Sequence, residues 1–341
     1  MNEITWPSIL GPLTKGDSLT SEQAAWAMGE IMDGRAAPAQ FGAFVASLRT
    51  KGETVDEILG LVQTMRGLSL KVETPYQVVD TCGTGGDRSG SINISTIAAL
   101  VAAGAGAKVA KHGNRAATSI CGSADLLEEL GVRINLPPEG VAKCIDQAGI
   151  GFCFAPVFHP SMRHAASPRK DIGVATVFNF LGPLTNPAGA LHQAIGVADE
   201  QMAYKMLEVL KRLGSVHVLM YMGSDGLDEL TTTGPSSMWE LREGEITERV
   251  LDPVDLGIKV TTAAELQGGD KAANAAVANS VLSGKHGAQR DVVALNAAAA
   301  LVAADMTEEF SHALEHAYES IDSGKAAASL ERLIDTSQSF E

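Results

Sequence analysis

From Pro75 onward, short β-type runs alternate with alanine-rich helical stretches. This alternation is typical of a parallel sheet whose strands are joined by crossover helices. The expected strands lie at 76–81, 108–110, 151–155, 192–197 and 217–222, and the expected helices at 95–105, 201–213, 295–304 and 310–320. The sequence therefore predicts an α/β domain with a central, mostly parallel sheet flanked by helices.

The first seventy residues instead have apolar side chains at helical spacing. Thr20 and Gln23 form a capping-box pattern ahead of one such run. Pro38 precedes another run and fits the first turn of a helix. We therefore expect a small helical domain over residues 1–72, followed by the α/β domain over residues 73–341.

The chain is acidic, with 41 Asp and Glu against 26 Lys and Arg and a formal net charge of −15. This charge argues against nucleic acid or an anionic membrane as a partner. The first residues do not resemble a signal peptide. The longest run of small and apolar residues, 96–107, is too short to span a bilayer. The four cysteines form no CxxC pair, so we expect a cytoplasmic location.

A glycine-rich segment, DTCGTGGD at 80–87, follows the first expected strand. Glycines let backbone amides turn toward a ligand without obstruction by a Cβ atom, which is how many loops hold phosphate. The segment matches neither common nucleotide motif, because Gly90 stands at the Walker lysine and Arg88 stands where a dinucleotide loop needs glycine. A tight structural turn is the alternative interpretation.

The segment KHGNR at 111–115 follows the next expected strand. Because ligands of open parallel sheets bind beyond the carboxyl ends of the strands, this loop and the glycine-rich loop are expected to face the same site. Two cations, an imidazole and an amide suit phosphate or pyrophosphate, whereas a solvated basic turn is the alternative.

Two further segments carry candidate ligand-binding side chains. DGLDE at 225–229 follows a strand and offers carboxylates of the kind that hold Mg²⁺, although an acidic surface turn is the common alternative. The stretches 154–164 and 179–187 supply prolines and aromatic rings suited to a flat ligand. No serine-hydrolase elbow and no zinc-hydrolase motif occurs in the sequence.

Taken in order, the motifs GTGGD, NIST, KHGNR, CGSAD, FAPVFHP, FNFLGPLTNPA and DGLDE closely resemble those of the anthranilate phosphoribosyltransferase family. The resemblance covers nearly the whole chain, including NAAAAL and IDSGKA near its end. It implies a helical domain hinged to an α/β domain of the nucleoside-phosphorylase type, a segment near 170–190 that returns to the helical domain, and a homodimer. It also implies transfer of a phosphoribosyl group from 5-phosphoribosyl 1-pyrophosphate to anthranilate in tryptophan biosynthesis.

The resemblance also implies roles for individual residues. It assigns phosphoribosyl pyrophosphate to Gly83, Thr84, Gly85, Gly86, Asp87, Asn93, Ser95, Thr96, Lys111 and Ser123. It assigns anthranilate to Asn114, Arg169, His112, His159 and Gly83, with Arg169 facing the carboxylate. It assigns two Mg²⁺ ions to Asp228 and Glu229, with Ser95 completing the second metal site.

The chain departs from the family pattern at two positions. Arg88 follows GTGGD where many members have glycine, and Ala175 stands where Arg or Pro is frequent. Two other functions stay open at this point. A pyrimidine nucleoside phosphorylase shares the fold, but its loop is of a KHS type rather than KHGNR, and a non-catalytic nucleotide sensor needs the phosphate loop without an acceptor site.

Overall fold

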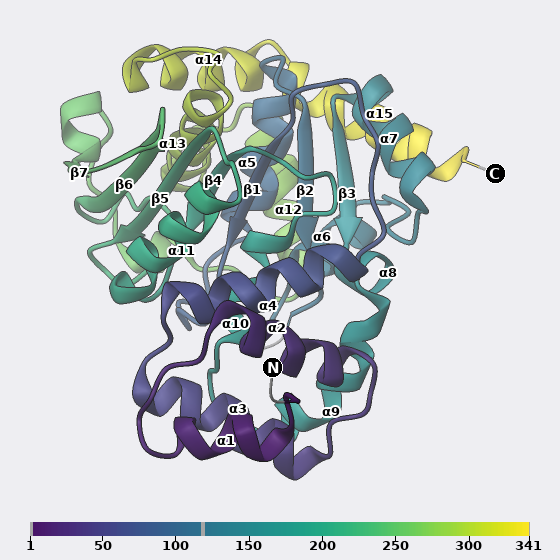
Figure 1. Ribbon diagram of the computed structural model, residues 1–341. Coiled ribbons are helices and arrows are strands. Elements are labelled where there is room, and N and C mark those ends of the chain that lie inside the picture. Colours follow the sequence, from purple (N-terminus) through teal and green to yellow (C-terminus); the bar gives the residue numbers. More distant parts are fainter. Residues whose placement is uncertain (1–2, 117–119, 341) are drawn as a thin grey trace.

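The computed structural model describes residues 3–116 and 120–340 (Figure 1). Its N-terminal part consists of the helices α1 (Trp6–Leu13), α2 (Ser21–Met32), α3 (Pro38–Lys51) and α4 (Val55–Leu68). The predicted caps are confirmed, since Thr20 and Gln23 form a reciprocal capping box on α2. Pro38 is the first residue of α3, where a missing N–H leaves no intrahelical bond unmade.

The α/β part contains a seven-stranded sheet with the order β3-β2-β1-β4-β5-β6-β7. Its strands are β1 (Val79–Gly83), β2 (Val109–Gly113), β3 (Ile150–Phe154), β4 (His192–Gly196), β5 (His217–Gly223), β6 (Ser236–Arg242) and β7 (Glu245–Leu251). The strands β1 to β5 pair in parallel, whereas β6 and β7 are antiparallel. The predicted mostly parallel sheet is confirmed, and the β6–β7 hairpin is an addition that the sequence pattern did not indicate.

Helices cover both faces of this sheet. The helices after α4 are α5 (Ile94–Gly104), α6 (Ser123–Glu129), α7 (Pro138–Ala148), α8 (Ala155–Phe158), α9 (Arg163–Ile172), α10 (Phe178–Leu181), α11 (Glu200–Arg212), α12 (Lys271–Leu282), α13 (Ala288–Ala303), α14 (Phe310–Asp322) and α15 (Lys325–Gln338). Of these, α9 packs against α2 and α3 rather than against the sheet. In the described part of the chain, none of the helices has the length and apolarity needed to cross a membrane.

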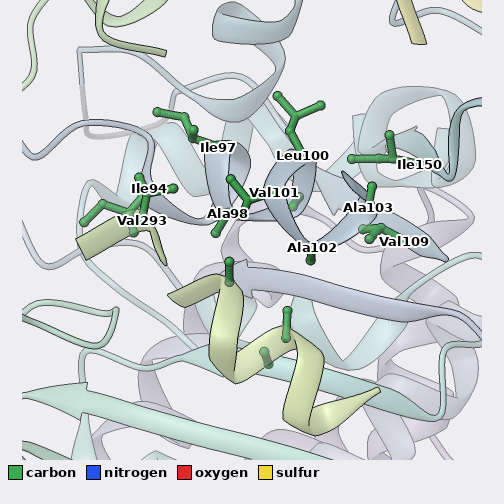
Figure 2. Close-up of a cluster of buried hydrophobic side chains, with 14 of the residues drawn as sticks. Ile94, Ile97, Ala98, Leu100, Val101, Ala102, Ala103, Val109, Ile150 and Val293 are labelled. Carbon is green, nitrogen blue, oxygen red and sulfur yellow. The ribbon is translucent and has the colours of Figure 1, made fainter. Parts of the chain in front are cut away.

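The larger apolar core surrounds α5. Ile97, Leu100 and Val101 of this helix have no exposed surface. Figure 2 shows them with Val293 of α13 and Ile150 of β3 around the same helix. Helix α5 is apolar on all sides because it is enclosed, so its N-terminus at the sheet edge is held rigidly.

A second apolar core joins the N-terminal helices to the other sheet face. It includes Phe44 of α3, Met206 of α11 and Met220 of β5. Phe178 of α10 also belongs to it, and its ring centroid lies 5.3 Å from that of Phe41. Figure 1 shows α9 beside the N-terminal helices. The division of the chain at residues 72 and 73, and the assignment of 170–190 to the helical domain, stay predictions.

The order of the strands reverses between β1 and β4. The chain runs from β1 through β2 to β3 on one side, and returns to place β4 and β5 on the other side. Ligands of open α/β sheets bind beyond the carboxyl ends of the strands at such a point. The parallel register pairs Gly83 of β1 with Gly196 of β4 at this edge.

Candidate active site

The glycine-rich loop after β1 has the backbone that its sequence predicts. Gly85 and Gly86 have φ values of 71° and 92°, in the left-handed region that glycine adopts at little cost. The hydroxyl oxygen of Thr84 accepts a hydrogen bond from the Ala198 amide at 3.2 Å, which ties the loop to the end of β4. The loop is therefore fixed at the edge of the sheet where β1 and β4 end.

Arg88 adopts a left-handed backbone with φ of 56° and is exposed. This conformation costs a non-glycine residue roughly 1 kcal/mol relative to glycine. The residue that departs from the family pattern in the sequence is thus also a strained residue in the structure.

Asp228 and Glu229 lie between the glycine-rich loop and the N-terminus of α5. Both are buried, with 8% and 7% of their surface exposed. Asp228 Oδ2 accepts a hydrogen bond from the Gly85 amide at 2.6 Å, and Glu229 Oε1 accepts one from the Ser95 amide at 3.1 Å. Glu229 Oε2 is buried without a hydrogen-bond partner among the described residues.

The surroundings of these two carboxylates make their ionised forms less favourable than those of exposed carboxylates. Burial, followed by the negative charges of Glu229 and Asp87, raises the pKa of Asp228 well above its ordinary value. Burial also raises the pKa of Glu229 to about 7, although the charge of Lys111 acts in the opposite direction. A positive charge bound between them would stabilise both carboxylates in the ionised form.

Lys111 lies beneath this acid pair and is 1% exposed. Its Nζ donates to the Thr81 carbonyl at 2.5 Å and to Ser95 Oγ at 3.4 Å. Burial lowers the pKa of Lys111, and the buried Asp80 carboxylate acts in the opposite direction. Thr96, also buried, follows Ser95 in the first turn of α5. Asp80 also belongs to this cluster, although the DTCGTGGD motif does not indicate a role for it.

Arg115, the second cation of KHGNR, points to a different set of partners. Its guanidinium lies 2.9 Å from carboxylate oxygens of both Asp125 and Glu128. The KHGNR motif predicts that Arg115 and Lys111 are two cations for phosphate, and the structure separates them.

Two polar side chains of the predicted phosphate site, Asn93 and Ser123, bond to the backbone of the segment between β2 and α6. Asn93 donates to the Cys121 carbonyl at 2.9 Å and accepts from Asn274 Nδ2 at 2.9 Å. Ser123 Oγ donates to the Asn114 carbonyl at 3.2 Å. Asn274, on α12, is a site neighbour that only the tertiary structure reveals.

The two predicted histidines hold the segment that follows α10. His112 Nδ1 donates to the Gly182 carbonyl at 3.1 Å, and His159 Nε2 donates to the Thr185 carbonyl at 3.1 Å. Burial lowers the pKa of His112 to about 4 and that of His159 to about 3. Both rings are therefore neutral near pH 7. Their centroids lie 5.1 Å apart.

Arg169 on α9 is a partly buried cation without a charged partner. Its guanidinium lies 5.5 Å from the centroid of the Phe178 ring, and burial lowers its pKa. Among the described residues, no carboxylate forms an ion pair with it. Such an arginine can bind a ligand carboxylate with two parallel hydrogen bonds.

Two family models match this fold, and both describe a glycosyl transferase family. The model of the "Glycosyl transferase family, helical bundle domain" matches residues 7–69, and that of the "Glycosyl transferase family, a/b domain" matches residues 75–327.

Individual relatives narrow the class further. The anthranilate phosphoribosyltransferase of Arthrobacter sp. (strain FB24) is 55% identical over 336 residues, covering 97% of this chain and 95% of the relative. The solved enzyme of the same name from Thermus thermophilus has a TM-score of 0.91 at 40% identity, covering 97% of this chain and 99% of that chain. The Saccharomyces cerevisiae enzyme in complex with PRPP and Mg has a TM-score of 0.91 at 28% identity, covering 99% of both chains. The chain belongs to the anthranilate phosphoribosyltransferase family.

Proposed function

We propose that this protein transfers the phosphoribosyl group of 5-phosphoribosyl 1-pyrophosphate to the amine of anthranilate, forming N-(5′-phosphoribosyl)anthranilate and pyrophosphate. The observation that carries this proposal is the buried Asp228–Glu229 pair held against the glycine-rich loop at the point where the strand order reverses. Full-length identity of 55% to the Arthrobacter enzyme supports the same reaction, which belongs to tryptophan biosynthesis.

The acid pair fits Mg²⁺. The donors are hard carboxylate oxygens, and Glu229 Oε2 is buried without a partner. No group of three His, Cys, Asp or Glu side chains in the described ranges forms a complete metal cage, as expected for an ion that takes its other ligands from water and substrate phosphates. A yeast relative was solved with PRPP and Mg, which supports Mg²⁺ here. Two ions per subunit, with Ser95 at the second, are part of the proposal.

When bound, Mg²⁺ neutralises negative charge that develops on pyrophosphate as the C1–O bond breaks. The residues of this chain contribute the positions around that charge. Backbone amides at the glycine-rich loop and at the α5 N-terminus are groups of the kind that stabilise anions, and those of Gly85 and Ser95 donate to the Asp228 and Glu229 carboxylates that would hold the metal. The residues proposed to bind the phosphoribosyl pyrophosphate are Gly83, Thr84, Gly85, Gly86, Asp87, Asn93, Ser95, Thr96, Lys111 and Ser123.

The acceptor side needs orientation more than proton transfer. The aromatic amine of anthranilate is already unprotonated near neutral pH, so it attacks without a strong general base. Arg169, which has no carboxylate partner among the described residues, is proposed to bind the anthranilate carboxylate. His112 and His159 hold the segment after α10 through its Gly182 and Thr185 carbonyls, and this segment is proposed to line the route by which anthranilate enters. Asn114 is proposed to orient the anthranilate ring.

A fluorescence assay tests the proposed reaction. Purified protein with anthranilate, phosphoribosyl pyrophosphate and Mg²⁺ should consume anthranilate fluorescence, and EDTA should stop the loss. Folded protein that leaves the fluorescence unchanged would refute the proposal. The pyrimidine nucleoside phosphorylase alternative instead predicts release of free base from thymidine or uridine with phosphate, and the relatives do not support it.

The proposal also includes a homodimer, formed through the helical domain. Light scattering in solution measures the assembly directly, and a mass near twice the chain mass of 35.5 kDa is expected. A mass equal to that of a single chain would contradict this part of the proposal.

A further inference from the structure

Asn296 on α13 lies against the chain segment that carries the acid pair. Its side chain is 1% exposed. Its Oδ1 accepts a hydrogen bond from the Leu230 amide at 3.0 Å, and its Nδ2 donates to the Leu230 carbonyl at 2.8 Å. The first of these bonds holds the peptide unit that joins Glu229 to Leu230. One rigid side-chain amide thus fixes the backbone directly after the second acid.

Asp225, at the start of this loop, also restrains it. The Asp225 carboxylate accepts hydrogen bonds from the hydroxyls of Thr231 and Thr233, at 2.8 and 2.7 Å. These bonds close the loop on itself, whereas the two acids accept hydrogen bonds from the Gly85 and Ser95 amides.

The acid pair also packs tightly against two strands. A Cβ at Gly83 would lie 2.2 Å from Asp228 Oδ2, and one at Gly196 would lie 1.6 Å from the Asp228 carbonyl oxygen. The acid pair therefore packs against the glycines of β1 and β4, and the residue that follows it is held by Asn296.

The helix that carries Asn296 is a rigid support. Val292, Val293 and Leu295 of α13 are fully buried in the larger core. Asparagine is a weak helix former, and a buried amide is costly unless its hydrogen bonds are made. Two of its three protein hydrogen bonds go to Leu230, and the third goes from Nδ2 to the Val292 carbonyl of its own helix at 2.8 Å.

We propose that Asn296 is a positioning residue that sets the Asp228 and Glu229 carboxylates for binding the metal–diphosphate end of the substrate. This inference rests on the proposed function. Residues that orient metal ligands from behind typically change metal affinity or activity by about 10- to 100-fold when they are removed. We expect weaker binding of phosphoribosyl pyrophosphate with Mg²⁺, and an unchanged KM for anthranilate.

Two variants separate the effect of losing the hydrogen bonds to Leu230 from the effect of changing a buried side chain. Asn296→Ala removes the whole amide. Asn296→Ser keeps a hydroxyl that can bond to the carbonyl four residues earlier, as serine does within helices, but it cannot bridge to Leu230. Ser320→Ala is the matched control, because it removes a buried hydrogen bond, from Ser320 Oγ to the Val101 carbonyl at 2.8 Å, away from the acid pair.

The experiment is calorimetric titration of phosphoribosyl pyrophosphate with Mg²⁺ in the absence of anthranilate, alongside steady-state kinetics and thermal unfolding. We expect Asn296→Ser and Asn296→Ala to bind at least about tenfold more weakly than wild type, and Ser320→Ala to bind normally despite a lower Tm. Asn296→Ser with affinity within about twofold of wild type would overturn the inference. Wild-type protein that neither binds nor turns over would instead refute the proposed function.

Discussion

Gly196→Ala tests whether the position of the acid pair controls activity. Gly196 is the last residue of β4, in ordinary strand backbone. An added Cβ would lie 1.6 Å from the Asp228 carbonyl oxygen, 2.3 Å from its carbonyl carbon and 3.0 Å from the Glu229 nitrogen. The obstructing atoms belong to the backbone, so no side-chain rotation can relieve the overlap.

The structure sets the size of the expected effect. Real Cβ atoms essentially never approach another heavy atom closer than 3.0 Å, so the 1.6 Å contact forces a displacement of at least about 1.4 Å. A misplacement of about 1 Å at a reacting group costs about 100-fold in rate. We therefore expect kcat/KM to fall by at least about 100-fold, with an overpacking cost of about 1–3 kcal/mol in the free energy of unfolding.

The assay is loss of anthranilate fluorescence at varied phosphoribosyl pyrophosphate, with urea unfolding measured in parallel. Gly42→Ala on α3 is the control, because a Cβ there meets nothing within 4 Å. This control should gain about 0.5–1 kcal/mol of stability and keep its kcat/KM. A folded Gly196→Ala protein with nearly wild-type kcat/KM would refute the claim that the acid pair must occupy this position.

Three further predictions concern other parts of the site. Glu229→Gln removes the charge of a buried carboxylate that has an unpartnered oxygen. The variant should fold, but it should lose turnover and show weaker Mg²⁺-dependent substrate binding by calorimetry. Wild-type turnover would contradict the assignment of Glu229 as a metal ligand. Arg88→Gly should be about 1 kcal/mol more stable than Arg88→Ala in urea unfolding, since position 88 has φ of 56°; equal stabilities would show that the strain is absent. Burial lowers the pKa of His112 to about 4 and of His159 to about 3, so the folded state keeps both neutral while the unfolded state binds protons below pH 6.5. Stability should therefore be full above that pH and fall as the pH drops toward 4, by about 2 kcal/mol for His112 between pH 7 and 5. The His112→Asn, His159→Gln double variant should lose less over this interval, and an equal loss would exclude these rings as the cause.

The sequence predicted the parallel strands and several helices because each has a local signal. The apolar runs at β1 to β5 and the capping box at Thr20 need no tertiary contact to be recognised. The β6–β7 hairpin lacks such a signal, since most of β7 is exposed and carries charged side chains. Its turn is also formed by Glu243 and Gly244, both with positive φ, of which only the glycine indicates a turn.

The candidate site was predictable where a motif carried the residues, and not where distant segments meet. Asp228 and Glu229 lie within one acidic motif, but the contact of Glu229 with Ser95 joins residues 134 positions apart. Asn296 bonds to the residue that follows the acid pair, and Gly196 packs against Asp228, through contacts that no local pattern indicates. Conversely, the pairing of Arg115 with Glu128 depends on the direction of a side chain, which the KHGNR motif does not determine.

The proposed reaction is tested most directly by following anthranilate fluorescence and pyrophosphate release in one reaction mixture. With wild-type protein and Mg²⁺, we predict equimolar loss of anthranilate and appearance of pyrophosphate, both dependent on phosphoribosyl pyrophosphate and both abolished by Glu229→Gln. Pyrophosphate release without loss of anthranilate, or no change in either signal with folded protein, would contradict transfer of the phosphoribosyl group to this acceptor.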